Sequence, residues 1–575
     1  MKMEMLGRFL PILGTLRSYN REKFSGDLSA GVTVAIMLVP QGMAYAILAG
    51  MPPVYGLYAS IIPLLIYAIF GSSRQLAVGP VAMVSLLVVA GVGELAEPGS
   101  DRFIHLAIMA ALGVGLVQFL MGVFRMGFLV NFLSHPVLSG FTSAAALIIG
   151  ASQIKNLLGL DLPRTKQVFE ILSGTIQNAS DISVYTALIG FSSILILILL
   201  KRWKKTFPSA LVVVVIGTVV TALLGLNGQG VAIVGTVPVG LPSFEVPGLN
   251  SSDFTSLVSI ILVISLVSYM ESIAVAKAIA NKKGYKVDAN QELIALGGAN
   301  LGGAFFQSFP VTGGFSRTAV NEQAGANTTV ATMITAVLIG LTVIFLTPLF
   351  YYLPNAVLAA IIMVAVAGLF DFKEMKNLWK TDKKDLAMLL VTFISTLVLG
   401  IEEGIAVGVV LSLVLVIYST TRPHSAELGR LGDTKNYRNI DRYREADVDD
   451  RILIYRYDSS LYFANVEHFQ ETLTDRMTRH GDSLELIILD ASAINSIDST
   501  GIHALEEMIS NMSERGIKFF IAGAIGPVRD KLKKSGIQEI MGEENFFFDV
   551  DDAVKFYKET GENIRGKFSP LQTNI

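Results

Sequence analysis

The feature that most constrains this chain is the distribution of its apolar residues. Through about 400 residues, as far as Tyr418, one apolar segment follows another, whereas the chain beyond Thr421 is densely charged. Of the 575 residues, 52% are hydrophobic and only 16% are charged, while a soluble domain carries charge on roughly a quarter of its residues. Because a run of ~20 apolar residues crosses the hydrocarbon of a bilayer, the sequence predicts a multi-spanning helical membrane domain followed by a soluble domain.

Hydropathy and breaker residues divide the apolar part into about fourteen spans. Lys and Arg concentrate in short loops on the cytoplasmic side of membrane proteins. With a cytoplasmic N-terminus, every basic cluster falls on the inner side: the N-terminal segment, Arg74, Arg125, 201–205, 281–286 and 373–384. The charge pattern therefore predicts a multi-pass protein of the cell inner (plasma) membrane with both termini in the cytoplasm.

The charged C-terminal part alternates predicted strands with predicted helices. The ranges 451–464, 484–492 and 517–524 read as strands, and 465–477 and 499–516 have helical spacing. Such alternation is typical of a small α/β domain with parallel strands. We predict an N-terminal segment 1–25, a transmembrane domain 26–420, a linker 421–445, the soluble domain 446–565 and a tail 566–575.

Two interrupted segments occupy matching places in the two halves of the membrane part. RQLAVGPVAMVS (74–85) and QSFPVTGGFSRTAV (307–320) each place Gly or Pro directly before a helical run. A matched pair of this kind is typical of a substrate site between inverted repeats. Helix starts present unpaired N–H groups and positive potential, which favour a small oxyanion, and Arg317 adds positive charge. The alternative is that these residues only allow close packing or a kink.

Glu271 lies deep in the apolar run SIILVISLVSYMESIAVAKAIA. An intramembrane acid usually marks an ion or proton route, so we expect it to bind and release a proton; a permanent pair with Arg317 is the alternative. Gln41 and Tyr45 follow Pro40 in the first span. Either side chain can contact an oxyanion or serve as an interhelical contact, and the sequence does not separate the two.

Long blocks around these residues resemble the sulfate permease (SulP) family. They are VPQGMAYAILAGMPPVYGLYASIIP with GSSRQLAVGPVAMVS, and NKKGYKVDANQELIALGGANLGGAFFQSFPVTGGFSRTAVNEQAG. The resemblance covers nearly the whole chain and includes the C-terminal domain that sulfate transporters share with anti-sigma-factor antagonists (STAS). It implies fourteen spans as two inverted seven-helix repeats, a core that moves against a gate, and a homodimer in the bilayer.

The resemblance also implies the residues of the anion site. They are Gln41, Ala44, Tyr45, Val81, Ala82, Gly314, Phe315, Ser316 and Arg317, with Glu271 nearby as the coupling residue. Sodium-coupled bicarbonate members tend to have Asp at the position of Glu271, and Glu is found in members regarded as proton-coupled. Val81 stands where relatives place an aromatic residue, which leaves the size of the pocket open.

These observations favour a secondary active transporter, with proton-coupled sulfate symport as the preferred function. Sodium-coupled bicarbonate transport, dicarboxylate transport and an uncoupled exchanger or channel are the alternatives. We expect no enzyme activity, because no nucleophile–base pair, metal cluster or cofactor loop is recognisable. The net charge of −3 indicates no nucleic-acid partner, and we expect no cofactor beyond the coupling proton, or sodium in the alternative.

Ser499, in NSIDSTGIHAL, matches the residue that is phosphorylated in anti-sigma antagonists. The favoured alternative is ordinary capping of the helix that begins there. A phosphate at a helix start would alter how the domain docks onto a partner, and an unidentified cytoplasmic protein is a candidate partner.

Overall fold

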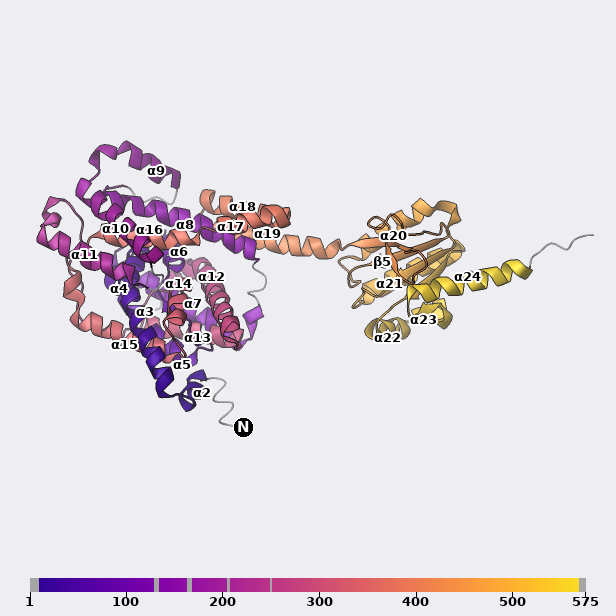
Figure 1. Ribbon diagram of the computed structural model, residues 1–575, viewed down its shortest axis with the longest axis horizontal. Helices are drawn as coiled ribbons and strands as arrows, with labels where there is room; N and C mark the ends of the chain where they lie inside the picture. The colour runs from indigo at the N-terminus through magenta and orange to yellow at the C-terminus, as the bar shows by residue number, and fades with distance from the viewer. Residues whose placement is uncertain (1–9, 129–133, 163–167, 204–206, 249–250, 568–575) are drawn as a thin grey trace, which may run out of the picture. The chain divides into compact units, whose positions relative to one another are not determined.

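The computed structural model describes residues 10–128, 134–162, 168–203, 207–248 and 251–567. The first nine residues of the predicted N-terminal segment and most of the predicted tail lie outside this part. The chain divides into two compact units, Met1–Ser412 and Leu413–Ile575 (Figure 1). Each unit is described separately below.

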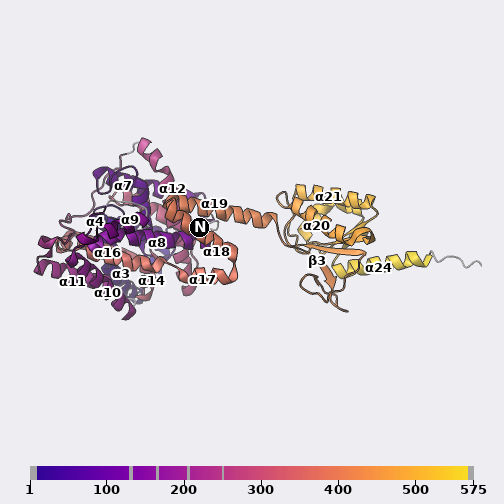
Figure 2. The ribbon, with the colours of Figure 1, turned by 90° about the horizontal axis from the view of Figure 1, so that it is seen from above.

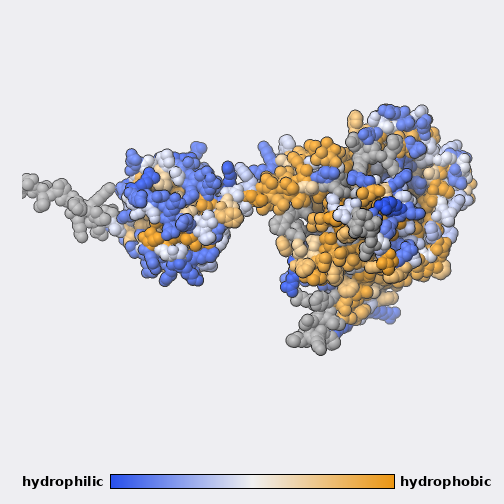
Figure 3. Space-filling model, turned by 180° about the vertical axis from the view of Figure 1, so that it is seen from behind, coloured by the Kyte–Doolittle hydropathy of each residue, from blue (hydrophilic) through white to orange (hydrophobic). Residues whose placement is uncertain are grey.

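The first unit is built from apolar helices. In the part of the chain that is described, eight helical stretches are long and apolar enough to cross a membrane. The helices that form them, with their shorter apolar neighbours, are α3 (Arg21–Leu48), α4 (Pro53–Tyr58), α5 (Ile62–Phe70), α7 (Asp101–Val123), α8 (His135–Leu158), α10 (Val184–Trp203), α11 (Ser209–Leu223), α12 (Ser251–Lys283), α13 (Ala289–Ala304), α15 (Val330–Phe345), α16 (Asn355–Val366), α18 (Lys383–Val398) and α19 (Ile401–Thr421). Hydrophobic side chains cover much of the visible face of this unit, while the second unit is largely hydrophilic (Figure 3). The multi-spanning helical fold is confirmed, and the count of about fourteen spans stays a prediction.

The two interrupted segments have the predicted form. Strand β1 (Val78–Gly79) precedes the short helix α6 (Ala82–Val92), and strand β2 (Thr312–Gly313) precedes α14 (Phe315–Gln323). The two strands pair with each other in antiparallel fashion. This pairing satisfies backbone groups that the interrupted helices leave free, as backbone inside a membrane protein requires. It also brings the starts of α6 and α14 to the same place.

Glycine residues allow the helices of this unit to pack closely. A Cβ atom on Gly297 would lie 2.4 Å from the backbone nitrogen of Phe119, where α13 runs along α7. A Cβ atom on Gly56 would lie 1.9 Å from the carbonyl oxygen of Gly42, where α4 meets α3. Small residues at helix contacts are typical of membrane proteins, in which packing drives helix association.

The second unit is a six-stranded sheet covered by helices on both faces. Its strands, in the order β4-β3-β5-β6-β7-β8, are β3 (Ser425–Arg430), β4 (Tyr437–Asn439), β5 (Ile452–Tyr457), β6 (Leu486–Asp490), β7 (Lys518–Ala522) and β8 (Phe546–Phe547). Helices α20 (Val466–His480), α21 (Ser499–Glu514), α22 (Gly526–Lys534) and α23 (Ile537–Met541) share a core with one face, and α24 (Val550–Lys567) packs on the other (Figure 2).

The strands from β5 to β8 are parallel, as the sequence predicts for this domain. The sheet begins earlier in the chain than expected, because β3 and β4 lie within the range 421–445 that we predicted as a linker. Strand β3 pairs antiparallel with β5 along its first three residues. Its sequence, SAELGR, mixes buried polar and small residues, so it carries no recognisable strand pattern.

The contact between Gly42 and Gly56 predicts a clear difference between two Gly→Ala variants. Gly56→Ala should lower the free energy of unfolding by about 1–3 kcal/mol, because the added methyl group must displace backbone in a packed interior. Gly228→Ala is the control, since a Cβ atom there meets nothing within 4 Å. Thermal unfolding in detergent, followed by size-exclusion chromatography, measures both. Equal melting temperatures would contradict the packing described here.

Candidate anion-binding site

The starts of α6 and α14 meet between the long helices α3 and α12, which pack against both of them. Arg317 lies in the first turn of α14 and is only 2% exposed. Its Nη1 donates a hydrogen bond to the carbonyl oxygen of Pro80, at 2.5 Å. Pro80 belongs to the first interrupted segment, so one guanidinium group joins the two segments at the point where they meet.

Arg317 has hydrogen-bonding capacity that this contact does not use. Among the described residues, its Nε and Nη2 have no hydrogen-bond partner, and neither does the buried Oε2 of Glu271 on α12. The two side chains interact electrostatically with each other, and both interact with the buried Tyr45 of α3. Free donors on a buried guanidinium are suited to an oxyanion, because Arg binds such groups through two parallel hydrogen bonds.

The two helix starts also leave donors free. The residues that cap them are Val81 for α6 and Gly314 for α14, and within the described part of the chain neither helix start has a side-chain cap. The first N–H groups of an α-helix lack intrahelical partners, and they attract anions together with the helix dipole. Two uncapped helix starts and a buried guanidinium therefore form an electropositive place in the fold.

The other predicted site residues differ in their surroundings. Ala44 and Ala82 are buried at the same crossing, and Gln41 and Val81 are half-buried. Phe315 is 63% exposed, and Ser316 beside it is also exposed. The structure thus encloses Tyr45, Ala44, Ala82 and Arg317, while Phe315 and Ser316 lie open at the start of α14.

Sequence reasoning missed the residues that hold β2 in place. The side chain of Asn300, on α13, accepts from the N–H of Val311 at 2.8 Å and donates to its carbonyl oxygen at 3.1 Å. Ser272 shares a hydrogen bond with Thr312 at 2.7 Å and accepts from the N–H of Gly313 at 2.8 Å. Because Ser272 follows Glu271 directly, the turn of α12 that carries the acid is fixed to the strand that leads into α14.

Sequence reasoning also missed two buried carboxylates that anchor the adjoining loops. Glu292, on α13, accepts from the N–H groups of Ser72 and Ser73 at 2.7 and 2.9 Å, just before β1. Asp27, on α3, accepts from the N–H groups of Asn327 and Thr328 at 2.7 and 2.9 Å, just after α14. No sequence pattern singles these residues out, because their partners are backbone groups far away in the chain.

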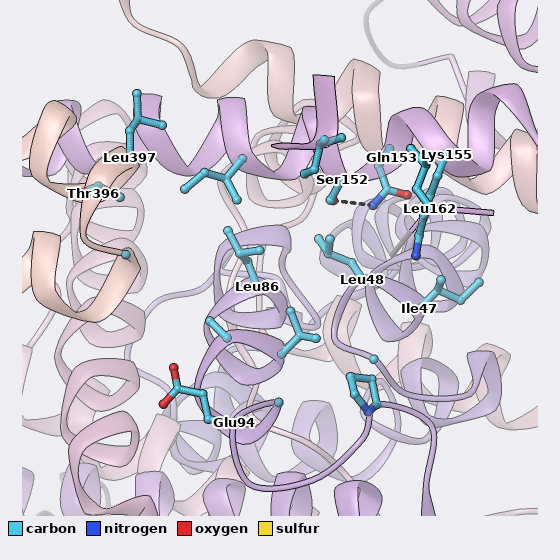
Figure 4. A pocket seen from close by; sticks show the side chains of 18 of the residues that line it. Ile47, Leu48, Leu86, Glu94, Ser152, Gln153, Lys155, Leu162, Thr396 and Leu397 are labelled. Carbon is cyan, nitrogen blue, oxygen red and sulfur yellow. Dashed lines mark hydrogen bonds between the residues drawn. The ribbon is translucent and has the colours of Figure 1, made fainter. Parts of the chain in front are cut away.

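A cavity of about 550 Å³ lies away from this crossing. It is lined by the C-terminal part of α6, including Leu86, and by residues of α3, α8 and the α18–α19 turn (Figure 4). Gln153 and Ser152 of α8, which are joined by a 3.0 Å hydrogen bond, form part of its wall. Arg317, Glu271 and Tyr45 do not line it. The candidate site is therefore marked by Arg317 and Glu271 and not by this cavity.

Comparison with known proteins shows which families the two parts of the chain match. The model of the sulfate permease family matches residues 24–392, and the model of the STAS domain matches residues 443–553. The chain is 41% identical over 572 residues to "Sulfate transporter 4.1, chloroplastic" of Arabidopsis thaliana, an alignment that covers 96% of this chain and 83% of that protein. It is 39% identical to "Probable sulfate transporter 4.2" of the same plant, with 96% and 84% covered.

A solved structure shares the fold of almost the whole chain. The murine Solute Carrier 26 family member A9 anion transporter, in the inward-facing state, superposes with a TM-score of 0.89 at 28% sequence identity, covering 97% of this chain and 95% of that one. The expected helical membrane fold with a C-terminal α/β domain is thereby confirmed.

The hydrogen bonds of Asn300 predict the effect of its removal. Asn300→Ala leaves the N–H and carbonyl of Val311 without their side-chain partner, which should lower the free energy of unfolding by about 1–3 kcal/mol and raise the KM for the transported anion. Asn495→Ala, at an exposed position of the second unit, is the control. Melting temperature and sulfate uptake into proteoliposomes measure the two effects. An unchanged KM would show that Asn300 does not position β2 for anion binding.

Proposed function

The chain belongs to the sulfate permease family, and we propose that it is a secondary active transporter that carries sulfate together with protons. A multi-pass anion transporter, not an enzyme, is what its family and its relatives support. The substrate and the coupling ion are the proposed part. The observation that carries the proposal is that, among the described residues, Nε and Nη2 of the buried Arg317 on α14 and Oε2 of Glu271 on α12 have no hydrogen-bond partner.

In this proposal sulfate binds where the starts of α6 and α14 meet. Two of its oxygens accept from the free N–H groups of Arg317, and others accept from the uncapped backbone of Ala82 and Phe315. Gln41 and Tyr45 of α3 complete the side of the site, with Ala44, Val81, Gly314 and Ser316 as close neighbours. The support is chemical, because this place combines a buried cation with unsatisfied donors and a tetrahedral dianion needs both.

The same pair supplies the coupling. When Glu271 is ionised, its negative charge repels an arriving anion. When Glu271 has taken up a proton, that repulsion is lost, Arg317 binds the anion, and the net negative charge of the loaded site is reduced. Coulomb interactions at short range are strong in a low-dielectric interior, so the site favours loading with anion and proton together and release of both together.

Transport then requires one part of the membrane unit to move past another. Helices α3, α6, α12 and α14 surround the site, whereas α8 packs mainly on α16 and α18. We propose that the first group is the moving core and the second the gate, as in transporters built from repeats. The cavity of Figure 4 lies between residues of both groups, which is where such a movement needs space.

We further propose the cell inner (plasma) membrane, with both termini cytoplasmic, on the strength of the basic loops. The name of one relative places that protein in the chloroplast, so the membrane in which this chain resides is to be determined by experiment.

We also propose that the chain forms a homodimer and that its STAS domain binds a cytoplasmic protein. In that domain Asp498 caps α21 by accepting from the N–H of Gly501 at 2.8 Å, and the neighbouring Ser499 is exposed and stays a candidate phosphorylation site.

Glu271→Gln should abolish sulfate accumulation that is driven by an inward proton gradient, because the amide cannot take up and release a proton. Sulfate counterflow exchange should persist, since Arg317 and the helix starts remain. Radiolabelled sulfate in proteoliposomes measures both activities. Glu97→Gln, at an exposed position, is the matched control. Accumulation that survives Glu271→Gln would remove the proposed proton role and would favour sodium coupling or an uncoupled exchanger.

Arg317→Gln should have a different effect, namely loss of both accumulation and exchange. The variant keeps a polar side chain but removes the positive charge that binds the anion. The expected loss of uptake is at least tenfold, as for truncation of a charged hydrogen-bonding partner. Retained exchange in this variant would show that the helix starts alone bind the anion and that the site is wrongly assigned.

A further inference from the structure

The short helix α17 (Phe372–Thr381) has an exposed face that packing within the chain does not explain. Its Leu378 is buried against Leu386 and Leu389 of α18. In contrast, Phe372 and Trp379 are each 69% exposed. These two residues are seven apart and so project from the same side of the helix. An aromatic pair of this size is costly to leave in water.

The connections of α17 place it at the ends of two apolar helices. It follows α16, an apolar helix that ends at Val366, and precedes α18, an apolar helix that begins at Lys383. Asp371 begins α17 by accepting from the N–H of Glu374 at 2.9 Å, so α17 is a separate helix rather than a continuation of α16. A charged helix between two apolar helices of a membrane protein lies at the border between hydrocarbon and water.

Within α17 the exposed lysines Lys373, Lys376 and Lys380 outnumber the one acid, Glu374. Five exposed lysines lie on α17 and the first turn of α18: Lys373, Lys376, Lys380, Lys383 and Lys384. Within the described ranges, none of them comes within 4 Å of an acid. Glu374 faces His135 at 3.5 Å, while Asp382 and Asp385 lie beside Lys383 and Lys384 at the start of α18.

We propose that α17 binds the headgroups of anionic phospholipids and lies in the plane of the membrane surface. Trp379 and Phe372 would enter the boundary between headgroups and acyl chains, where aromatic side chains accumulate. Lys373, Lys376 and Lys380 would contact the lipid phosphates, as basic residues of interfacial helices do. Charge complementarity selects this occupant, because a neutral protein surface or a purely zwitterionic membrane offers these lysines no excess of negative charge.

Lipid bound at α17 affects the helices that we propose as the gate, α8, α16 and α18. Both α16 and α18, which α17 connects, pack on α8. Lipid bound at α17 would therefore hold this group of helices to the membrane surface while the core moves. This last step rests on the proposed function, whereas lipid binding itself does not.

The chain offers a direct reporter, since Trp203 and Trp379 are its two tryptophans. The full chain carrying Trp203→Phe leaves Trp379 as the source of tryptophan fluorescence. The protein is reconstituted in phosphatidylcholine vesicles that contain either brominated phosphatidylglycerol or, at the same mole fraction, brominated phosphatidylcholine. We expect quenching by the anionic lipid to exceed quenching by the zwitterionic lipid by about twofold or more, and the excess to shrink as salt is added.

The lysines are tested in the same background. In the triple variant Lys373→Gln, Lys376→Gln and Lys380→Gln, quenching by the anionic lipid should no longer exceed quenching by the zwitterionic lipid. The control triple variant, which should keep the difference, changes exposed lysines of the second unit: Lys435→Gln, Lys533→Gln and Lys534→Gln. Equal quenching by the two lipids, or an excess that survives the triple variant, would overturn the proposal. Absence of quenching by either lipid would overturn it as well, and would indicate that protein covers Trp379. None of these readouts depends on transport, so their failure is separate from failure of the proposed function.

Discussion

The hydrogen bond from Arg317 to the carbonyl oxygen of Pro80 is the contact on which the candidate site depends. It joins two segments that are far apart in the chain, and it does so beside the antiparallel pair formed by β1 and β2. Aligning VGPVAMV with TGGFSRT places Met83 in the first segment where Arg317 stands in the second. The positive charge therefore comes from one half of the membrane unit and reaches across to the other. This asymmetry lets a single guanidinium serve the whole site.

Interrupting two helices inside a membrane has a cost, because each freed backbone group needs a partner. Among the described residues, side chains meet part of that need. Asn300 and Ser272 bind the backbone of β2, and the carboxylates of Glu292 and Asp27 each accept from two successive N–H groups of a neighbouring loop. Among the described residues of the membrane unit, the buried side-chain atoms without a hydrogen-bond partner include Nε and Nη2 of Arg317 and Oε2 of Glu271, and no side chain caps the two helix starts. The donors left over are those that an anion can use.

Much of this arrangement could be predicted from the sequence, because hydrophobic length, breaker residues and the matched positions of the two interrupted segments follow directly from physical chemistry. Arg317 and Glu271 stood out since charge in an apolar span is rare. Asn300 and Glu292 did not, because their role depends on backbone far away in the chain, and spacing alone does not reveal such a contact. Strand β3 was missed for a related reason, since it is defined by its pairing with β5 rather than by its own pattern.

The central claim is that each sulfate moves with protons, because an ionised Glu271 repels the anion that Arg317 binds. The most direct test imposes an inward sulfate gradient on proteoliposomes that hold the purified protein, with no initial pH difference and with a pH-sensitive dye inside. The account predicts that the lumen becomes acidic as sulfate enters, at a rate proportional to sulfate uptake. Sulfate entry without acidification would contradict it, and would leave a sulfate transporter whose buried acid has another role.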